Sequence, residues 1–130
     1  MAHPPNTALS DYRSLHFEND VADASPHRLI QMLMQRLLAN LAQAKQQMAA
    51  GAVGRKGELI SDAISIIDCL RASLNFDEGG DVAGNLEALY DYMTRNLLLA
   101  NMSNDADKLQ TVTLLVEEIK GAWDSIGDKV

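Results

Sequence analysis

Residues 81–102 read DVAGNLEALYDYMTRNLLLANM and have the apolar spacing of an α-helix. At about 100° per residue, one narrow stripe contains Val82, Leu86, Leu89, Met93, Leu97 and Ala100. Tyr90 lies on one shoulder of this stripe, and Tyr92 and Leu99 lie on the other. The apolar arc spans roughly 200°, which is wider than one buried face needs. Either a second neighbouring helix in a bundle or a partner molecule would account for the extra width.

Three further helices are predicted from start, stop and periodicity signals. Ser25-Pro26 is a helix start, with Ser as N-cap and Pro at the first position, and we expect this helix to end near Ala50, before Gly51. The next helix is predicted from about Arg55 to Phe76, because its isoleucines recur every three to four residues.

The remaining boundaries depend on turn residues. Residues 75–80 are predicted to form a turn in which Gly79-Gly80 can adopt positive φ, and Asp81 is the expected N-cap of the helix over 81–102. Asn104, with Asp107 three residues later, is the expected cap of a last helix whose apolar face runs from Leu109 to Ile126.

Four helices of about twenty residues joined by short turns require antiparallel neighbours. The predicted fold is therefore all-α, an antiparallel up-down-up-down four-helix bundle at residues 25–130 with a short N-terminal arm at residues 1–24. The arm is too short and too polar to be a stable helix alone. Its apolar residues Tyr12, Leu15 and Phe17 can pack on the bundle.

Composition excludes several classes of function. The chain has 130 residues, 47% of them apolar, which is enough for one domain with a real core. A net charge of −7 opposes nucleic-acid binding. The single cysteine, Cys69, rules out an internal disulfide and favours a reducing compartment. Without a long apolar run or signal-peptide features, we expect a cytosolic protein with no membrane insertion.

No residue pattern indicates a catalytic or metal site. The histidines His3, His16 and His27 all lie ahead of or at the start of the first long helix, and Glu-x-x-His does not occur, so we expect no metal and no cofactor. A histidine phosphotransfer bundle is the enzyme-like alternative, because Arg28 stands beside His27. However, His27 follows Pro26 directly, so a surface histidine at a helix start is the preferred interpretation. A purely structural helical subunit is the other alternative.

Five short strings, in order and in register, resemble the flagellar secretion chaperone family FliS. They are ASPHRLIQML at 24–33, RASLN at 71–75 followed by Gly79-Gly80, NLEALYDYM at 85–93, Ala100-Asn101, and EIKGAW at 118–123. Met34 stands where the family commonly has a tyrosine, and Asn75 where it commonly has an aspartate. The resemblance covers about residues 12–126.

The resemblance implies a binding protein rather than an enzyme. A chaperone of this family binds the C-terminal segment of newly made flagellin in the cytosol, prevents its premature polymerisation and assists its delivery to the flagellar type III export gate. It also implies an N-terminal arm that covers part of the binding groove, with Tyr12 as the candidate residue. The sequence leaves monomer and homodimer open for the free protein.

The apolar faces of the first and third helices are the predicted lining of the flagellin groove. Together with Tyr12 of the arm, the predicted contact residues are Ile30, Leu33, Met34, Leu37, Leu86, Leu89, Tyr90, Met93 and Leu97.

Overall fold

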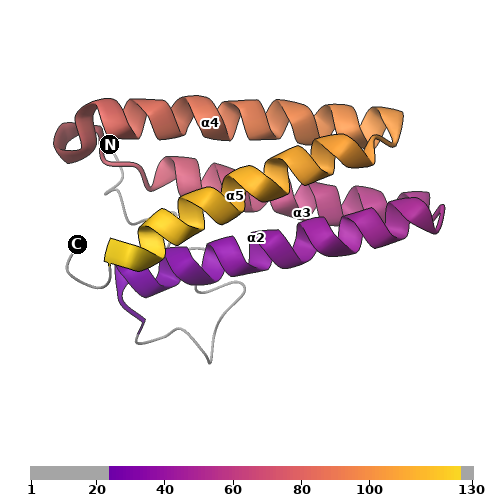
Figure 1. Ribbon diagram of the computed structural model, residues 1–130, viewed down its shortest axis with the longest axis horizontal. Helices are drawn as coiled ribbons and strands as arrows, with labels where there is room; N and C mark the ends of the chain where they lie inside the picture. The colour runs from indigo at the N-terminus through magenta and orange to yellow at the C-terminus, as the bar shows by residue number, and fades with distance from the viewer. Residues whose placement is uncertain (1–23, 127–130) are drawn as a thin grey trace, which may run out of the picture.

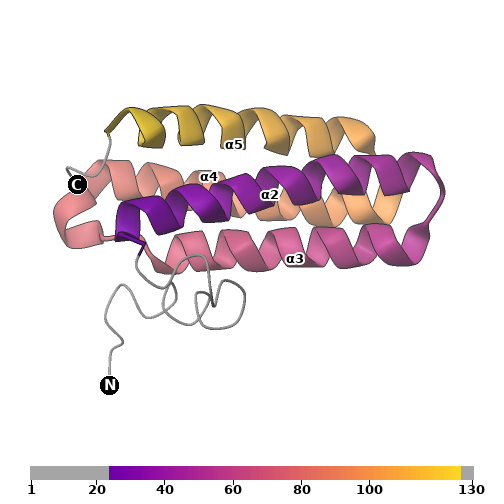
Figure 2. The ribbon, with the colours of Figure 1, turned by 90° about the horizontal axis from the view of Figure 1, so that it is seen from below.

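The structure, a computed structural model, describes residues 24–126. Within this range the chain forms α2 (Pro26–Ala49), α3 (Val53–Ala72), α4 (Phe76–Ser103) and α5 (Ala106–Ile126). Each helix packs on the next one along the chain, and α5 returns to pack on α2 (Figure 1, Figure 2). Helices α2 and α4 therefore occupy opposite corners. The predicted antiparallel four-helix bundle is confirmed, while the predicted arm lies outside the described residues except for Ala24.

Helix α2 begins and ends as its sequence signals predict. The Ser25 hydroxyl oxygen accepts a hydrogen bond from the Arg28 backbone N–H at 3.1 Å, and Pro26 is the first helical residue. After the helix, Gly51 adopts a φ of +75°, a conformation in which a residue without a Cβ is favoured.

The start of α4 differs from the predicted boundary. Helix α3 ends at Ala72 rather than near Phe76, and Phe76 is the first residue of α4. The N-cap is Asn75 and not Asp81, because the Asn75 side-chain oxygen accepts a hydrogen bond from the Glu78 N–H at 3.1 Å. Residues 76–79 thus form a helical turn, which Gly80 interrupts with a φ of +49° and a ψ of −122°.

The junction between α4 and α5 also corrects a predicted cap. Asn104 closes α4 in the left-handed conformation, with a φ of 52°, which asparagine tolerates better than most residues. The side chain of Asp105, rather than that of Asn104, accepts a hydrogen bond from the Asp107 N–H, at 3.0 Å. A turn this short gives one capping residue to each helix.

All four helices contribute to one apolar core. Its largest fully buried side chains are Leu29, Leu33, Leu37, Leu41, Ile60, Ile66, Ile67, Met93, Leu97, Leu109 and Val112. Burying each such side chain stabilises the fold by about 1.5–3 kcal/mol before conformational entropy is counted. Among residues 24–126, no helix has the length and apolar character needed to cross a membrane.

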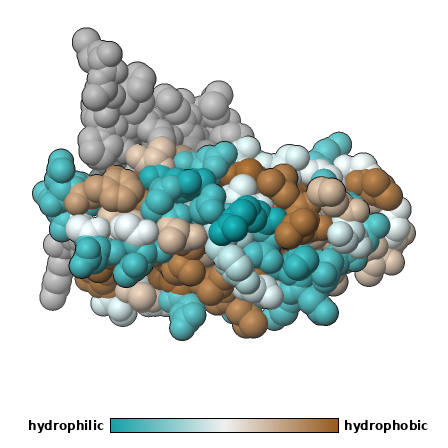
Figure 3. All heavy atoms as spheres, turned by 90° about the horizontal axis from the view of Figure 1, so that it is seen from above, coloured by the Kyte–Doolittle hydropathy of each residue, from teal (hydrophilic) through white to brown (hydrophobic). Residues whose placement is uncertain are grey.

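Most of the large apolar side chains that remain exposed belong to α4. They are Phe76, Val82, Tyr92, Leu98, Leu99 and Met102, whereas Val53, Leu114 and Ile126 lie on other helices. Figure 3 looks down onto α4 and shows apolar groups interspersed with polar ones on this side of the molecule. Helix α4 therefore has more exposed large apolar side chains than any other described helix.

The backbone at Gly80 gives a direct test of this fold. Gly80→Ala should lower the free energy of unfolding by about 1–3 kcal/mol, because an alanine rarely adopts this φ and ψ. No atom lies within 4 Å of a Cβ built at Gly80 or at Gly84, so sterics do not distinguish the two sites. Gly84→Ala, within regular helix, should instead stabilise by about 0.5–1 kcal/mol. Urea unfolding followed by circular dichroism measures both, and equal effects would contradict the kink.

Candidate functional site

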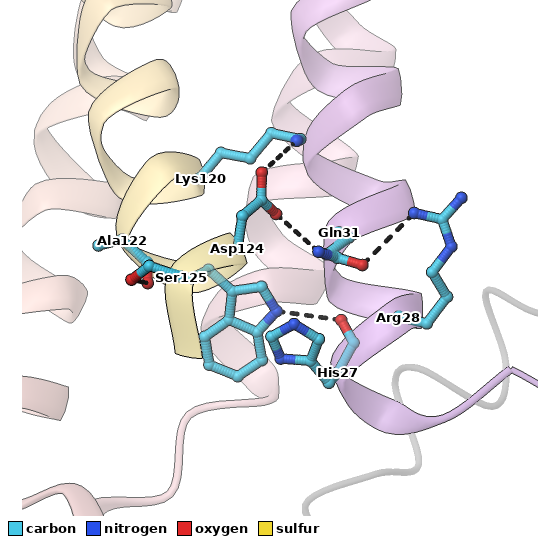
Figure 4. Close-up of polar contacts among 8 residues, drawn as sticks. His27, Arg28, Gln31, Lys120, Ala122, Asp124 and Ser125 are labelled. Atoms are coloured by element: carbon cyan, nitrogen blue, oxygen red, sulfur yellow. Dashed lines mark hydrogen bonds and ion pairs between the residues drawn. The ribbon is translucent and has the colours of Figure 1, made fainter. Parts of the chain in front are cut away.

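Trp123 fastens the end of α5 to the start of α2. Its indole Nε1 donates a hydrogen bond to the backbone carbonyl oxygen of His27 at 3.0 Å, and the two rings stack with centroids 4.8 Å apart (Figure 4). His27 is only 4% exposed, so the prediction of a surface histidine is wrong. The residue lies on the side of α2 that faces α5, where the indole covers it. The phosphotransfer alternative requires an exposed histidine to accept the phosphoryl group, and the His27 ring is buried.

A polar layer extends this contact along the two helices. Gln31 Nε2 donates to Asp124 Oδ1 at 2.8 Å, and Lys120 Nζ donates to Asp124 Oδ2 at 2.7 Å (Figure 4). The hydrogen bond from Lys120, followed by that from Gln31, lowers the pKa of the Asp124 carboxyl below its ordinary value. We call His27, Gln31, Trp123 and Asp124 the α2–α5 clasp.

The clasp sets the position of α5 relative to α4. Helix α5 starts at the turn beside the end of α4 and ends beside the start of α2, so the axes of α4 and α5 diverge from their shared turn (Figure 1). Leu86 and Leu89 of α4 and Ile119 of α5 pack on the core but stay only partly buried. These three apolar side chains therefore remain partly accessible.

The ion pair between Arg71 and Glu87 shows which side of α4 faces α3. Arg71 Nε donates to Glu87 Oε1 at 3.1 Å, and this hydrogen bonding lowers the pKa of the Glu87 carboxyl. At about 100° per residue, Tyr92 and Leu99 lie on the opposite side of the helix, toward α5. Their side chains are 42% and 46% exposed.

The same reasoning identifies the side of α5 that faces α4. Gln110 accepts a hydrogen bond from Lys45 of α2, and Asp124 belongs to the clasp, so both lie on the α2 side of α5. Leu115 and Ile119 fall on the other side of the helix and are partly buried. One surface strip thus contains Leu89, Tyr92 and Leu99 of α4 with Leu115 and Ile119 of α5, and we call it the α4–α5 strip.

The hollow between α2 and α5 fits an apolar partner less well. It has a volume of about 420 Å³ and is lined by Gln35, Leu38, Glu117, Lys120, Gly121 and Asp124. Only Leu38 offers a large apolar side chain there. Among residues 24–126, no group of three histidine, cysteine or acidic side chains could hold a metal ion.

Most of the predicted groove residues lie in the core of the bundle. Leu33, Leu37, Met93 and Leu97 are fully buried. Ile30, Met34 and Tyr90 are nearly so, and burial raises the pKa of the Tyr90 hydroxyl to about 12. All seven residues belong to the buried core, and α2 and α4 occupy opposite corners, so these residues do not line a groove shared by the two helices.

One of the predicted residues, Leu89, lies on the α4–α5 strip, whereas Leu86 is partly buried but points in the core direction of α4. Tyr12 lies outside the described residues. Sequence reasoning missed Leu115 and Ile119 as surface residues, and it noted Tyr92 and Leu99 only as the shoulder of the apolar arc. That shoulder was the available signal for a binding surface. A side chain about 100° from the core direction is not needed for core packing, so an apolar residue there indicates another role.

Comparison with known proteins identifies the family. The family model described as "Flagellar protein FliS" matches residues 8–130. The flagellar secretion chaperone FliSB of Pseudomonas aeruginosa is 47% identical over 92% of this chain and 94% of its own length. The flagellar secretion chaperone FliS of Salmonella typhimurium is 42% identical over 95% of this chain and 92% of its own, and that of Vibrio cholerae is 40% identical over 92% and 88%. The chain belongs to the FliS family of flagellar secretion chaperones, which are chaperones and not enzymes.

Proposed function

We propose that this protein is a cytosolic export chaperone that binds the C-terminal segment of newly made flagellin. By covering that segment it prevents premature polymerisation, and it assists delivery to the flagellar type III export apparatus. The observation that carries the proposal is the exposed α4–α5 strip on a protein whose relatives are flagellar secretion chaperones. The export gate is a proposed second partner.

The shape of the strip suits an amphipathic helix. Tyr92 and Leu99 are two helical turns apart on α4, and Leu115 and Ile119 are one turn apart on α5. A bound helix can therefore lay apolar residues at i, i+3, i+4 and i+7 against both rows. Because a disordered segment loses conformational entropy on binding, the contact must cover a large area. Rows on two helices, from Leu89 to Leu99 on α4 and from Leu115 to Ile119 on α5, provide a wider contact than one helix alone.

The buried residues on the predicted list have a different role in this proposal. Leu33, Leu37, Met93 and Leu97 hold α2 and α4 in the core, and so they fix the position of the strip without touching the partner. Direct contact with flagellin is proposed for Leu89 of the list, and for Tyr92, Leu99, Leu115 and Ile119 in addition.

Adjacent leucines on α4 allow a matched test of the strip. Leu98 and Leu99 are 51% and 46% exposed, but Leu98 lies toward α3 and Leu99 toward α5. Leu99→Ser should weaken binding of the flagellin C-terminal segment about 5- to 30-fold, equivalent to about 1–2 kcal/mol of lost apolar contact. Leu98→Ser should change it less than about twofold. Calorimetric titration measures both, and the reverse order of effects would place the partner on the α3 side.

The length of the bound segment provides another test. If flagellin lies along the whole strip, removing successive helical pieces from its C-terminal segment should lower the affinity stepwise. Each piece contacts a different part of α4 and α5, so no single piece should supply all the binding free energy. A short peptide that keeps the full affinity of the segment would contradict extended binding.

Residues 1–24 remain the proposed arm, with Tyr12 as the residue that covers apolar surface until flagellin arrives. An arm that competes with flagellin reduces the population of binding-competent chaperone. Removing residues 1–23 should therefore raise the flagellin association rate in stopped-flow experiments and increase apolar dye binding by the free protein. A slower association rate, with unchanged dye binding, would contradict a covering role.

A further inference from the structure

A cavity of about 320 Å³ opens at the end of the bundle where the α2–α3 turn and the α4–α5 turn lie close together (Figure 1). Two lysines line it, Lys45 of α2 and Lys56 of α3. The rest of its lining is largely apolar, from Met48, Ala52, Val53 and Ala106. The lining, which consists of described residues only, contains neither Asp nor Glu. The cavity is thus a cationic, partly apolar site on a chain whose net charge is −7.

Lys56 is a buried ammonium with only neutral partners. It is 3% exposed, and its Nζ donates to the Asn101 backbone carbonyl at 2.9 Å and to Asn104 Oδ1 at 2.5 Å. These two bonds connect Lys56 to the end of α4, and among residues 24–126 the third ammonium proton has no acceptor. Within residues 24–126, none of the ion pairs includes Lys56.

Lys45 adds a second positive charge of the same kind. It is half-buried, and its Nζ donates to the side-chain oxygen of Gln110, which is also neutral. A buried charge without an opposite charge is unfavourable. An anion that enters the cavity would supply that charge, and hydrogen bonds between an ammonium group and an anion are among the stronger ones in proteins.

The lining favours a carboxylate on an apolar group over a phosphate. A free phosphate could pair with the lysines, but it would leave the apolar part of the lining uncovered. The apolar residues opposite the lysines suit one aliphatic side chain. A C-terminal residue of a polypeptide has both parts in one unit, and capture of a chain end in this way is a known mode of recognition.

We propose that this cavity binds the α-carboxylate and last side chain of the polypeptide held by the chaperone. The proposal rests on the proposed function, because a bound C-terminal segment brings its own chain end. Asn104 lines the cavity five residues after Leu99 of the α4–α5 strip, about 7.5 Å along a helix axis. A segment that leaves the strip at the α4–α5 turn can therefore place its end beside Lys45 and Lys56.

The cavity itself can be tested with a small probe on the full-length chaperone. N-acetyl-leucine has the carboxylate and the aliphatic group, and N-acetyl-leucine amide lacks only the charge. In titrations followed by amide NMR, the acid should shift the signals of Gly51 and Asn104 saturably and the amide should not. Lys45→Gln should weaken binding of the acid about tenfold. Arg55→Gln is the matched control, because it removes the same charge from an exposed side chain outside the lining.

The occupant is tested with the flagellin C-terminal segment made as a free acid and as an amide. The acid should bind the chaperone about tenfold more tightly, and Lys45→Gln but not Arg55→Gln should abolish the difference. Equal affinities, combined with N-acetyl-leucine binding, would assign the cavity to free carboxylic acids and overturn the proposed occupant. If neither form of the segment binds, the proposed function is contradicted, and the N-acetyl-leucine titration still tests the cavity independently. No response to N-acetyl-leucine, or an equal response to its amide, would overturn the site itself.

Discussion

The packing of Trp123 on the start of α2 is the contact that determines which surface of this bundle stays exposed. The indole stacks on the His27 ring and donates a hydrogen bond to the His27 carbonyl, and one turn of α2 further on Gln31 holds Asp124. Helix α5 is the last of the described helices. The clasp holds the C-terminal end of α5 against α2, so this end lies away from α4 (Figure 1). The apolar side chains between α4 and α5 stay partly uncovered as a result.

Exposed apolar surface makes a protein without a partner prone to aggregation, but a protein that binds an unfolded segment needs such a surface. Large exposed apolar patches promote association, and a net charge of −7 on each copy opposes it. The strip and the lysine-lined cavity are complementary in chemistry, because the first offers only apolar contact and the second offers charge. A strip of aliphatic contacts provides area with little directional preference, whereas a carboxylate bound at one end would fix the register of the segment.

The sequence predicted the fold well because periodicity, Ser25-Pro26 and Gly51 are local signals that the structure uses directly. Boundaries were less predictable at 75–80 and 104–105, where adjacent residues compete for the same role. Asn75 can cap a helix as well as Asp81 can. Which of the two is the N-cap depends on where α3 ends and α4 begins. His27 was misjudged because its burial depends on Trp123, which is 96 residues away in the chain.

The candidate site was harder to predict than the fold, for a geometrical reason. A helical wheel gives the direction of the core for each helix, but it does not say which helices are neighbours. Leu33 of α2 and Met93 of α4 both look like contact residues on their own wheels. In the bundle both are buried in the core, although their helices occupy opposite corners. Tyr92 and Leu99 sit on the shoulder of the wheel, where apolar side chains exceed what the core can bury.

Photo-crosslinking from α4 is the most direct test of whether flagellin lies on the strip. A photoreactive side chain at position 92 or position 99 of the full-length chaperone should attach to the flagellin C-terminal segment in high yield, and mass spectrometry should locate the links on the apolar face of that segment. The same side chain at position 98, equally exposed but directed toward α3, should give little product. Efficient crosslinking from position 98 with none from positions 92 and 99 would show that flagellin binds elsewhere on the bundle.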